Sequence, residues 1–332
     1  MQEAIINKAK QLLADGTVDR VIGWKRGEFA YDITPAVFGS AEEIDADFVY
    51  DDFTSANVSK YLVKETKKEG KVLVFLKPCD TYSLNQLTKE HRVDREKVYV
   101  VGIPGGPKLD IEKIKAKGIS GILSVKNENY TLKIETIYGE ETMPFSEAIL
   151  DKCASCKSKK HVVYDELIGE DGEVLESNRF DMVEQLENMT AEERYNFWRE
   201  QLSKCIRCNA CRNVCPACTC EKCVFDNPES GVENKAASDS FEENMFHIIR
   251  AFHVAGRCTD CGECSRVCPQ NIPLHLLNRK FIKDINSLYG EYQAGEDTTS
   301  RAPLTNYTTD DCEPSIVHER GVEQCLKYQN QS

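Results

Sequence analysis

The stretch C-I-R-C-N-A-C-R-N-V-C-P at residues 205–216 decides the architecture of this chain, and it occurs twice. A second copy, C-T-D-C-G-E-C-S-R-V-C-P, occupies residues 258–269, 53 positions further along. Both copies have the spacing C-x2-C-x2-C-x3-C-P, which in bacterial iron–sulfur proteins holds two [4Fe-4S] clusters. Three thiolates on a tight loop reach one cluster, and the fourth, which opens the next helix, reaches the other. The sequence therefore predicts a two-cluster electron-transfer module.

This exchange of the fourth ligand divides the motif cysteines into two predicted sets. The first cluster is assigned to Cys205, Cys208, Cys211 and Cys268. The second cluster is assigned to Cys258, Cys261, Cys264 and Cys215. Zinc is the alternative occupant, but zinc sites usually combine two short C-x2-4-C knuckles and not a run of this kind.

The composition is that of an ordinary soluble protein. The chain has 332 residues, of which 41% are hydrophobic and 29% charged, and a formal net charge of -13. This length accommodates about two domains. The negative charge argues against a nucleic-acid partner, because phosphate binding needs a concentrated basic surface. The sequence has no apolar stretch long enough for a membrane span and lacks the features of a signal peptide, so we expect a cytoplasmic protein. In such a protein the cysteines are expected to bind metal and not to form disulfides.

Residues 1–150 alternate between helical and strand-like segments. The apolar runs at 71–76 and 98–102 each end in a proline-containing loop, and a helix is predicted between them from about residue 81 to 90. This order implies parallel strands with a right-handed crossover, whose loops lie where α/β folds place ligands. The loop at 103–107 contains two prolines, so a tight turn is favoured over a phosphate site.

Further elements follow from local signals. Alternating segments on either side of residues 127–129 predict a β-hairpin. Thr190 and Glu193 form a capping box for a helix whose apolar stripe includes Tyr195. Two more helices are predicted, over 241–255 and directly after Pro273. The apolar face of the last should cover the clusters with Leu276, Leu277, Phe281, Ile285 and Leu288.

The predicted fold class is α+β, with an N-terminal α/β domain followed by a mainly helical, bacterial-type dicluster ferredoxin domain. The α/β domain is expected at residues 1–150 and the ferredoxin-like domain at 190–290. A connector at 151–189 joins them, and a tail at 291–332 lies on the surface or on a partner. The basic run at the start of the connector, from Lys152 to His161, is expected to be a solvated loop.

Eight cysteines remain outside the doubled motif. Cys153 and Cys156 form a C-x2-C pair that needs further ligands from elsewhere if it binds metal. The candidates for this third site are Cys79, Cys153, Cys156, Cys218, Cys220 and Cys223. The alternative is a redox dithiol or a remnant pair without metal. Cys312 and Cys325 stand alone, and we expect them to be structural.

Histidines and cations near the motifs are candidates for tuning the clusters. His247 and His253 stand six residues apart on one predicted helix, so they do not share a face. A hydrogen bond near a cluster sulfur is favoured over iron ligation for either. A cation beside a reduced cluster stabilises the added electron and raises its potential. The cations considered for this role are Arg250, Arg257, Arg207, Lys204, Arg212 and Arg266.

The motif regions resemble a known family. The runs CIRCNACRNVCPACTCEKC (205–223) and FHIIRAFHVAGRCTDCGECSRVCPQNIPLHLLNRK (246–280) are similar to the dicluster iron–sulfur subunits grouped with coenzyme F420 hydrogenase/dehydrogenase and formate dehydrogenase beta subunits. The loop KPCDTYSLNQL (77–87) is similar to those subunits and to the A subunit of anaerobic sulfite reductase. The resemblance covers about residues 70–290.

This resemblance implies a subunit that passes electrons between a catalytic partner, of formate dehydrogenase or hydrogenase type, and a heterodisulfide-reductase-like flavoprotein. Some members of the family bind FAD. In the family pattern a further cysteine commonly follows the second strand and helps to complete an N-terminal cluster. This chain has Gly105 there, so Cys79, Cys153 and Cys156 supply three thiolates.

The sequence thus predicts a non-catalytic iron–sulfur subunit of a cytoplasmic, anaerobic oxidoreductase complex, with two [4Fe-4S] clusters and the third site undecided. The alternative is a FAD-containing beta subunit that itself reduces or oxidises a deazaflavin of F420 type or a related hydride carrier. A zinc-stabilised interaction module is the third hypothesis. Because no Walker A motif or G-x-G-x-x-G follows a strand, no residue is assigned to catalysis or to flavin binding.

Overall fold

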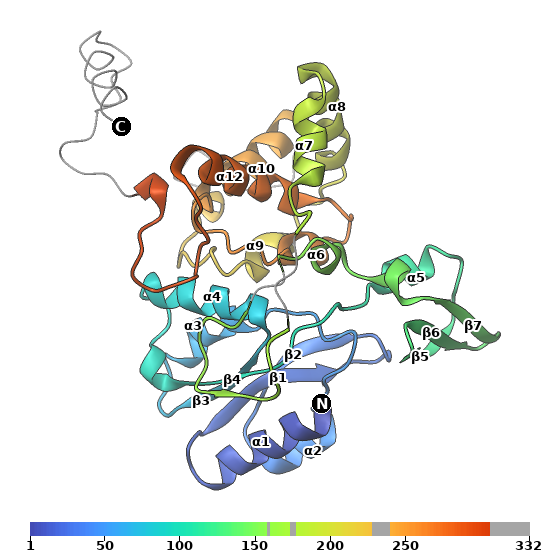
Figure 1. Ribbon diagram of the computed structural model, residues 1–332, viewed down its shortest axis with the longest axis vertical. Helices are drawn as coiled ribbons and strands as arrows, with labels where there is room; N and C mark the ends of the chain where they lie inside the picture. The colour runs from blue at the N-terminus through green and yellow to red at the C-terminus, as the bar shows by residue number, and fades with distance from the viewer. Residues whose placement is uncertain (158–159, 173–176, 228–239, 306–332) are drawn as a thin grey trace.

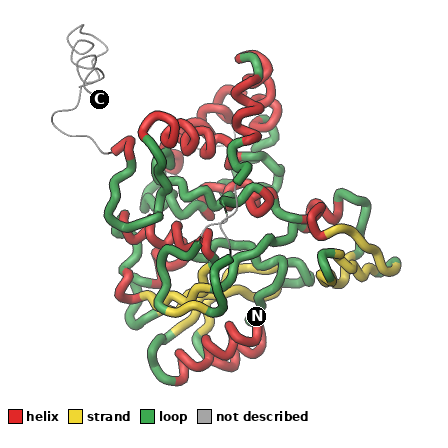
Figure 2. Tube along the Cα trace, in the orientation of Figure 1, coloured by secondary structure: helices red, strands yellow, loops and turns green. Residues whose placement is uncertain are grey.

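The computed structural model describes residues 1–157, 160–172, 177–227 and 240–305 (Figure 1). The first half of the chain builds a region around a β-sheet. The two cysteine motifs lie in a region of helices and loops on one side of that sheet. Figure 2 shows this division, with the strands in the lower and right parts of the view, helices above them, and two further helices below them near the N-terminus. The fold is α+β, as the sequence predicts.

The main sheet has five strands in the order β2-β1-β3-β4-β8. The pairs β1–β3, β3–β4 and β4–β8 are parallel, whereas β2 is antiparallel to β1. Val72 lies opposite Val98, which confirms the predicted parallel pair. The strands are β1 (Arg20–Arg26), β2 (Ile33–Phe38), β3 (Val72–Leu76), β4 (Val98–Gly102) and β8 (Glu166–Leu167).

Helices cover both faces of this sheet. In Figure 1, α1 and α2 lie below the sheet, and α3 and α4 lie above it, between the sheet and the motif helices. α4 begins at Pro78, three residues before its predicted start, because proline suits the first turn of a helix. The helices are α1 (Gln2–Ala14), α2 (Ala41–Asp47), α3 (Leu62–Glu65) and α4 (Pro78–Lys89).

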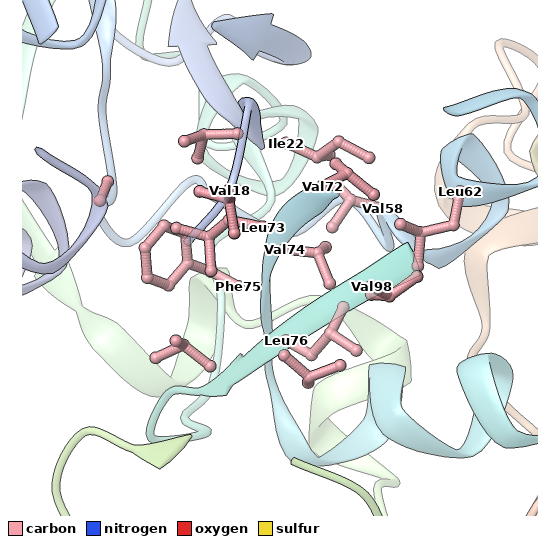
Figure 3. Packing of buried hydrophobic residues seen from close by; sticks show 14 of the residues in the cluster. Val18, Ile22, Val58, Leu62, Val72, Leu73, Val74, Phe75, Leu76 and Val98 are labelled. Carbon is pink, nitrogen blue, oxygen red and sulfur yellow. The ribbon is translucent and has the colours of Figure 1, made fainter. Parts of the chain in front are cut away.

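Strand β3 forms the centre of the hydrophobic core. All of its residues, Val72–Leu76, are fully buried, because helices cover both faces of this parallel sheet. Figure 3 shows these side chains beside Val18, Ile22, Val58 and Val98 from neighbouring segments. The rigid sheet fixes where its strands end, and β3 ends immediately before the loop that carries Cys79.

A second, antiparallel sheet contains the predicted hairpin and one strand that the sequence did not indicate. Its first turn falls at Asn129 and Tyr130, with φ of 52° and 63°, and not at residues 127–129. The hydrogen bonds of the ladder extend to Glu128, which moves the turn. The strands of this sheet are β5 (Ile122–Glu128), β6 (Thr131–Thr136) and β7 (Gly139–Pro144), and helix α5 (Ile111–Lys115) precedes them in the chain.

The segment expected to be a connector, 151–189, adds structure to both regions. Helix α6 (Asp151–Ala154) carries Cys153. Strand β8 joins the main sheet beside β4, a pairing that its short acidic sequence does not indicate. Helix α7 (Asp181–Asn188) packs against the last long helix of the chain, α12.

The helical region begins at the predicted capping box. The N–H of Glu193 donates to Thr190 Oγ1 at 3.2 Å, and the N–H of Thr190 donates to Glu193 Oε2 at 2.9 Å. Two residues expected on apolar faces are exposed. Tyr195 lies near the start of the projecting α8, and Leu288 lies in the last turn of α12. The helices are α8 (Ala191–Leu202), α9 (Ala210–Val214), α10 (Ser240–His253), α11 (Glu263–Arg266) and α12 (Leu274–Tyr289).

Residues 291–305, the start of the predicted tail, lie across α4 and the end of α10. The side chain of Asn85 donates to the carbonyl oxygen of Glu296 at 3.4 Å, and Tyr292 Oη donates to the carbonyl oxygen of Gly256 at 3.0 Å. Residues 306–332, which include Cys312 and Cys325, lie outside the described residues.

We expect Gly295→Ala to lower the free energy of unfolding by about 1–3 kcal/mol, the usual cost of overpacking. Gly295 has φ of 78°, and a Cβ atom there would lie 1.9 Å from the carbonyl oxygen of Tyr82. Urea unfolding measures the change. Gly106→Ala is the control, because a Cβ there meets no atom within 4 Å. Equal stability of the two variants would show that residues near 295 do not pack on α4.

Candidate metal centre

The two cysteine motifs fold into loops with the same backbone signature. In the first, Arg207 and Asn209 have positive φ of 52° and 61°. In the second, the equivalent residues Asp260 and Gly262 have φ of 59° and 68°. Left-handed residues at the second and fourth positions after the first cysteine turn each loop back on itself. The helices that follow, α9 and α11, pack against each other, so the two loops lie close together.

Cysteines from both motifs line one cavity. Its wall contains three cysteines of the first motif and the last cysteine of the second. They are Cys205, Cys208, Cys211 and Cys268. Buried Leu202, Ile272 and Leu274 pack around these residues and limit the access of water. The donor set and its apolar surround fit an iron–sulfur cluster, whose irons are held by four thiolates.

The remaining motif cysteines form a second group. Burial raises the pKa of Cys258 to about 12 and that of Cys264 to about 11, and it raises the pKa of Cys261 strongly. The negative charge of Cys215 contributes to all three shifts, so Cys215 lies near this triplet. Thiols that resist ionisation when buried bind metal as thiolates because the metal's charge stabilises them.

Helix α10 presents His247 to the first cavity and leaves His253 outside it. His247 is 1% exposed and lines the cavity, and neither of its ring nitrogens has a hydrogen-bond partner among the described residues. Burial, with the charges of Arg250 and Arg207, lowers its pKa to about 3, so the ring is neutral. His253 is exposed and lies against the ring of Phe225. The expectation that the two histidines do not share a face is confirmed.

The arginines near the motifs differ in their partners. Arg212 pairs with Asp226 at 2.9 Å, Arg257 with Glu90 at 2.5 Å, and Arg266 with Glu263 at 2.7 Å. The guanidinium of Arg207 lies over the ring of Phe246 at 4.0 Å. Lys204 is exposed and donates to Gln201. Arg250 is buried, and none of the carboxylates in the described part of the chain forms an ion pair with it.

A buried ionic group joins the α/β region to the second motif. Glu263 in α11 is fully buried and accepts hydrogen bonds from Lys152, from Arg266 and from the N–H of Asn57. Burial raises the pKa of Glu263, but the charges of Arg266 and Lys152 outweigh it and hold that pKa well below its usual range. The run from Lys152 to His161 was expected to be a solvated loop, but neither of its ends is solvated. Lys152 pairs with Glu263, and His161 is buried and contacts Asp171.

The six candidates for a third site fall into two places. Cys79 occupies the first turn of α4, and its raised pKa reflects burial, Asp80 and nearby Cys156. The negative charges of Cys153 and Cys79 both help to raise the pKa of Lys152. Cys79, Cys153 and Cys156 therefore lie near one another. The others belong to the first motif and the segment that follows it. Cys218 hydrogen-bonds Cys215, Arg212 donates to Cys223, and Cys220 is exposed.

Gly105 lies beside the Cys79 segment. A Cβ atom at Gly105 would lie 3.1 Å from Cδ of Pro78. Residues 103–107 form an irregular loop and not the predicted tight turn. Among the described residues, no three or more His, Cys, Asp or Glu side chains are grouped as a ready site for a single metal ion.

Two buried lysines near the Cys79 segment were missed by sequence reasoning. Lys77 is 3% exposed and pairs with Asp80 at 2.7 Å. Lys108 is 6% exposed, and burial lowers its pKa to about 8. Lysine is usually a surface residue, so the residue type gave no sign of burial. The only signal was the place of both residues in loops at the ends of parallel strands.

Comparison with known proteins agrees with this arrangement. The family model of the 4Fe-4S dicluster domain matches residues 201–272. The chain is 24% identical over 355 residues to the F420-dependent formate dehydrogenase subunit beta of Methanocaldococcus jannaschii, covering 90% of this chain and 92% of the relative. It is 26% identical over 346 residues to the F420-dependent formate dehydrogenase 1 subunit beta of Methanococcus maripaludis, covering 83% and 87%.

Among solved structures, the F420-reducing [NiFe] hydrogenase complex from Methanosarcina barkeri matches with a TM-score of 0.34 and 15% identity, over 47% of this chain and 63% of that chain. None of the helices in the described part of the chain has the length and apolar character of a membrane span. Residues 201–272 therefore match a 4Fe-4S dicluster domain, and most of the chain is similar to the beta subunits of F420-dependent formate dehydrogenases.

Proposed function

We propose that this protein is an electron-transfer subunit with two [4Fe-4S] clusters, and that its two motifs exchange their fourth ligands. The observation that supports this most strongly is the cavity lined by Cys205, Cys208 and Cys211 together with Cys268. If each motif served its own cluster, Cys215 and not Cys268 would line this cavity. The second cluster is assigned to Cys258, Cys261, Cys264 and Cys215.

The chain's own residues hold and shield the clusters, which when bound supply one-electron transfer. Leu202, Ile272 and Leu274 exclude water from the first site, and the neutral ring of His247 offers an N–H for a sulfur acceptor. A hydrogen bond to a sulfur is one of the features that set a cluster's potential. The packing of α9 on α11 keeps the two sites close together, as electron transfer between them requires.

The partners that we propose are a catalytic subunit of formate dehydrogenase or hydrogenase type and a heterodisulfide-reductase-like flavoprotein, in an anaerobic cytoplasmic complex. The names of the two relatives support the first part, since each is a beta subunit of a formate dehydrogenase. Co-purification of a tagged chain from its native host under anaerobic conditions tests the proposal. Recovery of the chain without any oxidoreductase subunit would contradict it.

The relatives also favour a second candidate, a FAD-containing beta subunit that itself reduces or oxidises a deazaflavin. Both relatives are described as F420-dependent, and F420 is a deazaflavin. The absorption spectrum of the purified chain separates the two candidates. A bound flavin released by acid precipitation supports the second, and its absence after purification in the presence of FAD supports a subunit that only conducts electrons.

We expect the anaerobically purified chain to hold about eight irons and about eight acid-labile sulfides, as two four-iron clusters require. Treatment with a chelator after oxidation should bleach the brown colour and remove the iron. A zinc-stabilised module would be colourless and would hold zinc in place of iron. Iron analysis together with EPR of the dithionite-reduced protein measures the outcome, and fewer than about eight irons in fully loaded protein would contradict the two-cluster proposal.

A further inference from the structure

Arg250 is a buried cation without an ion-pair partner among the described residues. It is 3% exposed, and its Nη2 donates a hydrogen bond to the carbonyl oxygen of Cys211 at 3.1 Å. Its Nε is buried and has no partner in the described part of the chain. A guanidinium held away from water in this way is costly unless a negative charge compensates it. No aspartate or glutamate of the described residues does so.

The position of Arg250 indicates what compensates it. It lies on α10, one helical turn after His247, which lines the first cavity. The contact with Cys211 joins it to the first set of thiolates. Its electrostatic neighbours also include Cys264 and Cys215, which belong to the second set. The guanidinium therefore lies between the two sites, where each cluster with its thiolates carries negative charge.

Other arginines near the motifs do not share this arrangement. Arg257 and Arg266 each form ion pairs with a carboxylate at short distance. Their charges are already balanced, so they add little net field at the clusters. Arg250, in contrast, is buried, has no carboxylate partner among the described residues, and lies near cysteines of both sets.

We propose that Arg250 is the shared counter-cation of the two clusters and raises the reduction potential of both. This inference rests on the proposed two-cluster function. Reduction adds one negative charge to a cluster, and a fixed positive charge nearby stabilises the reduced form. Because one residue lies near both sites, it shifts the potentials of both clusters in the same direction.

The test compares Arg250→Gln, which removes the charge, with Arg250→Lys, which keeps it. Arg20→Gln is the control, because it removes the same charge at a residue that pairs with Glu65 in the α/β region. Each variant is purified anaerobically, its iron is measured, and its clusters are titrated by EPR at fixed potentials. For Arg250→Gln we expect both clusters to become at least tenfold harder to reduce, a shift of about 59 mV or more for a one-electron couple. We expect Arg250→Lys and Arg20→Gln to stay within about threefold of the wild type.

Each outcome decides the proposal. Wild-type potentials in an iron-replete Arg250→Gln variant overturn it, as does a shift of one cluster alone. If Arg250→Gln loses iron, the Lys variant carries the test. Full iron and wild-type potentials with Lys support the charge role, whereas a tenfold shift or loss of iron with Lys shows that the guanidinium acts through packing and overturns the proposal. Failure of the wild type to hold two four-iron clusters would contradict the proposed function itself, before any variant is titrated.

Discussion

Replacing Cys268 by Ala is expected to remove the cluster of the first motif and to leave the cluster of its own motif intact. Cys268 lies in the second motif by sequence but lines the cavity formed by Cys205, Cys208 and Cys211. Loss of one of four thiolate ligands prevents stable assembly of that cluster. The iron content should fall from about eight to about four per chain.

The identity of the lost cluster is established by comparison with two further variants. Cys208→Ala removes a ligand of the first triplet, and Cys261→Ala removes a ligand of the second. We expect the reduced EPR spectrum and the potential of Cys268→Ala to match those of Cys208→Ala. A match to Cys261→Ala would show that the motifs do not exchange ligands. Cys220→Ala is the control, because Cys220 is exposed and lies outside both sets, and it should keep all of its iron.

The reciprocal variant strengthens this test. Cys215→Ala should resemble Cys261→Ala, because the charge of Cys215 acts on Cys258, Cys261 and Cys264. The two reciprocal results together distinguish exchange of ligands from a general loss of folding, which would remove both clusters in every variant.

Replacing Glu263 by Ala is expected to lower the free energy of unfolding by about 3–5 kcal/mol, the usual cost of breaking a buried ion pair. The carboxylate is fully buried and is bonded by Lys152, by Arg266 and by the backbone N–H of Asn57. Its removal leaves two cations without this partner, and the side chain of Lys152 is only 9% exposed. Urea unfolding of the iron-loaded protein, followed anaerobically by circular dichroism, measures the change.

Two comparisons make this prediction specific. Lys152→Met should cost less than Glu263→Ala, because Arg266 still neutralises Glu263 when Lys152 is absent. Glu187→Ala is the control for a carboxylate with two lysine partners at the surface, since its side chain is 29% exposed. Exposed ion pairs contribute little, so this control should change stability by about 1 kcal/mol or less. Equal losses in Glu263→Ala and Glu187→Ala would contradict a buried link between the α/β region and the second motif.

Local signals in the sequence were sufficient for several individual elements. The continuous apolar runs of β3 and β4 predicted buried parallel strands, because only a strand covered on both faces tolerates such a run. The start of α8 was predictable because its capping box consists of two hydrogen bonds between Thr190 and Glu193, which lie close together in the sequence. The predicted start of α4 was wrong by a few residues, since Pro78 and Cys79 belong to a run that is typical of a loop.

Pairings between distant segments could not be predicted in this way. Strand β8 has only two residues, and its place beside β4 depends on the edge that the sheet offers. The burial of Lys152 depends on Glu263, which lies 111 residues further along the chain. The third-site candidates also separated according to the fold, with Cys79, Cys153 and Cys156 on one side and Cys218 beside Cys215 on the other.

The sequence by itself determined that this chain carries two iron–sulfur motifs, because the ligand spacing is set by the short reach of a cysteine side chain on one loop. Only the tertiary structure decided what surrounds them. It buried Arg250 near cysteines of both sets without a carboxylate from the described residues, and it joined the second motif to the α/β region through Glu263. The physical reason is that charge compensation acts through space, between residues that the chain separates.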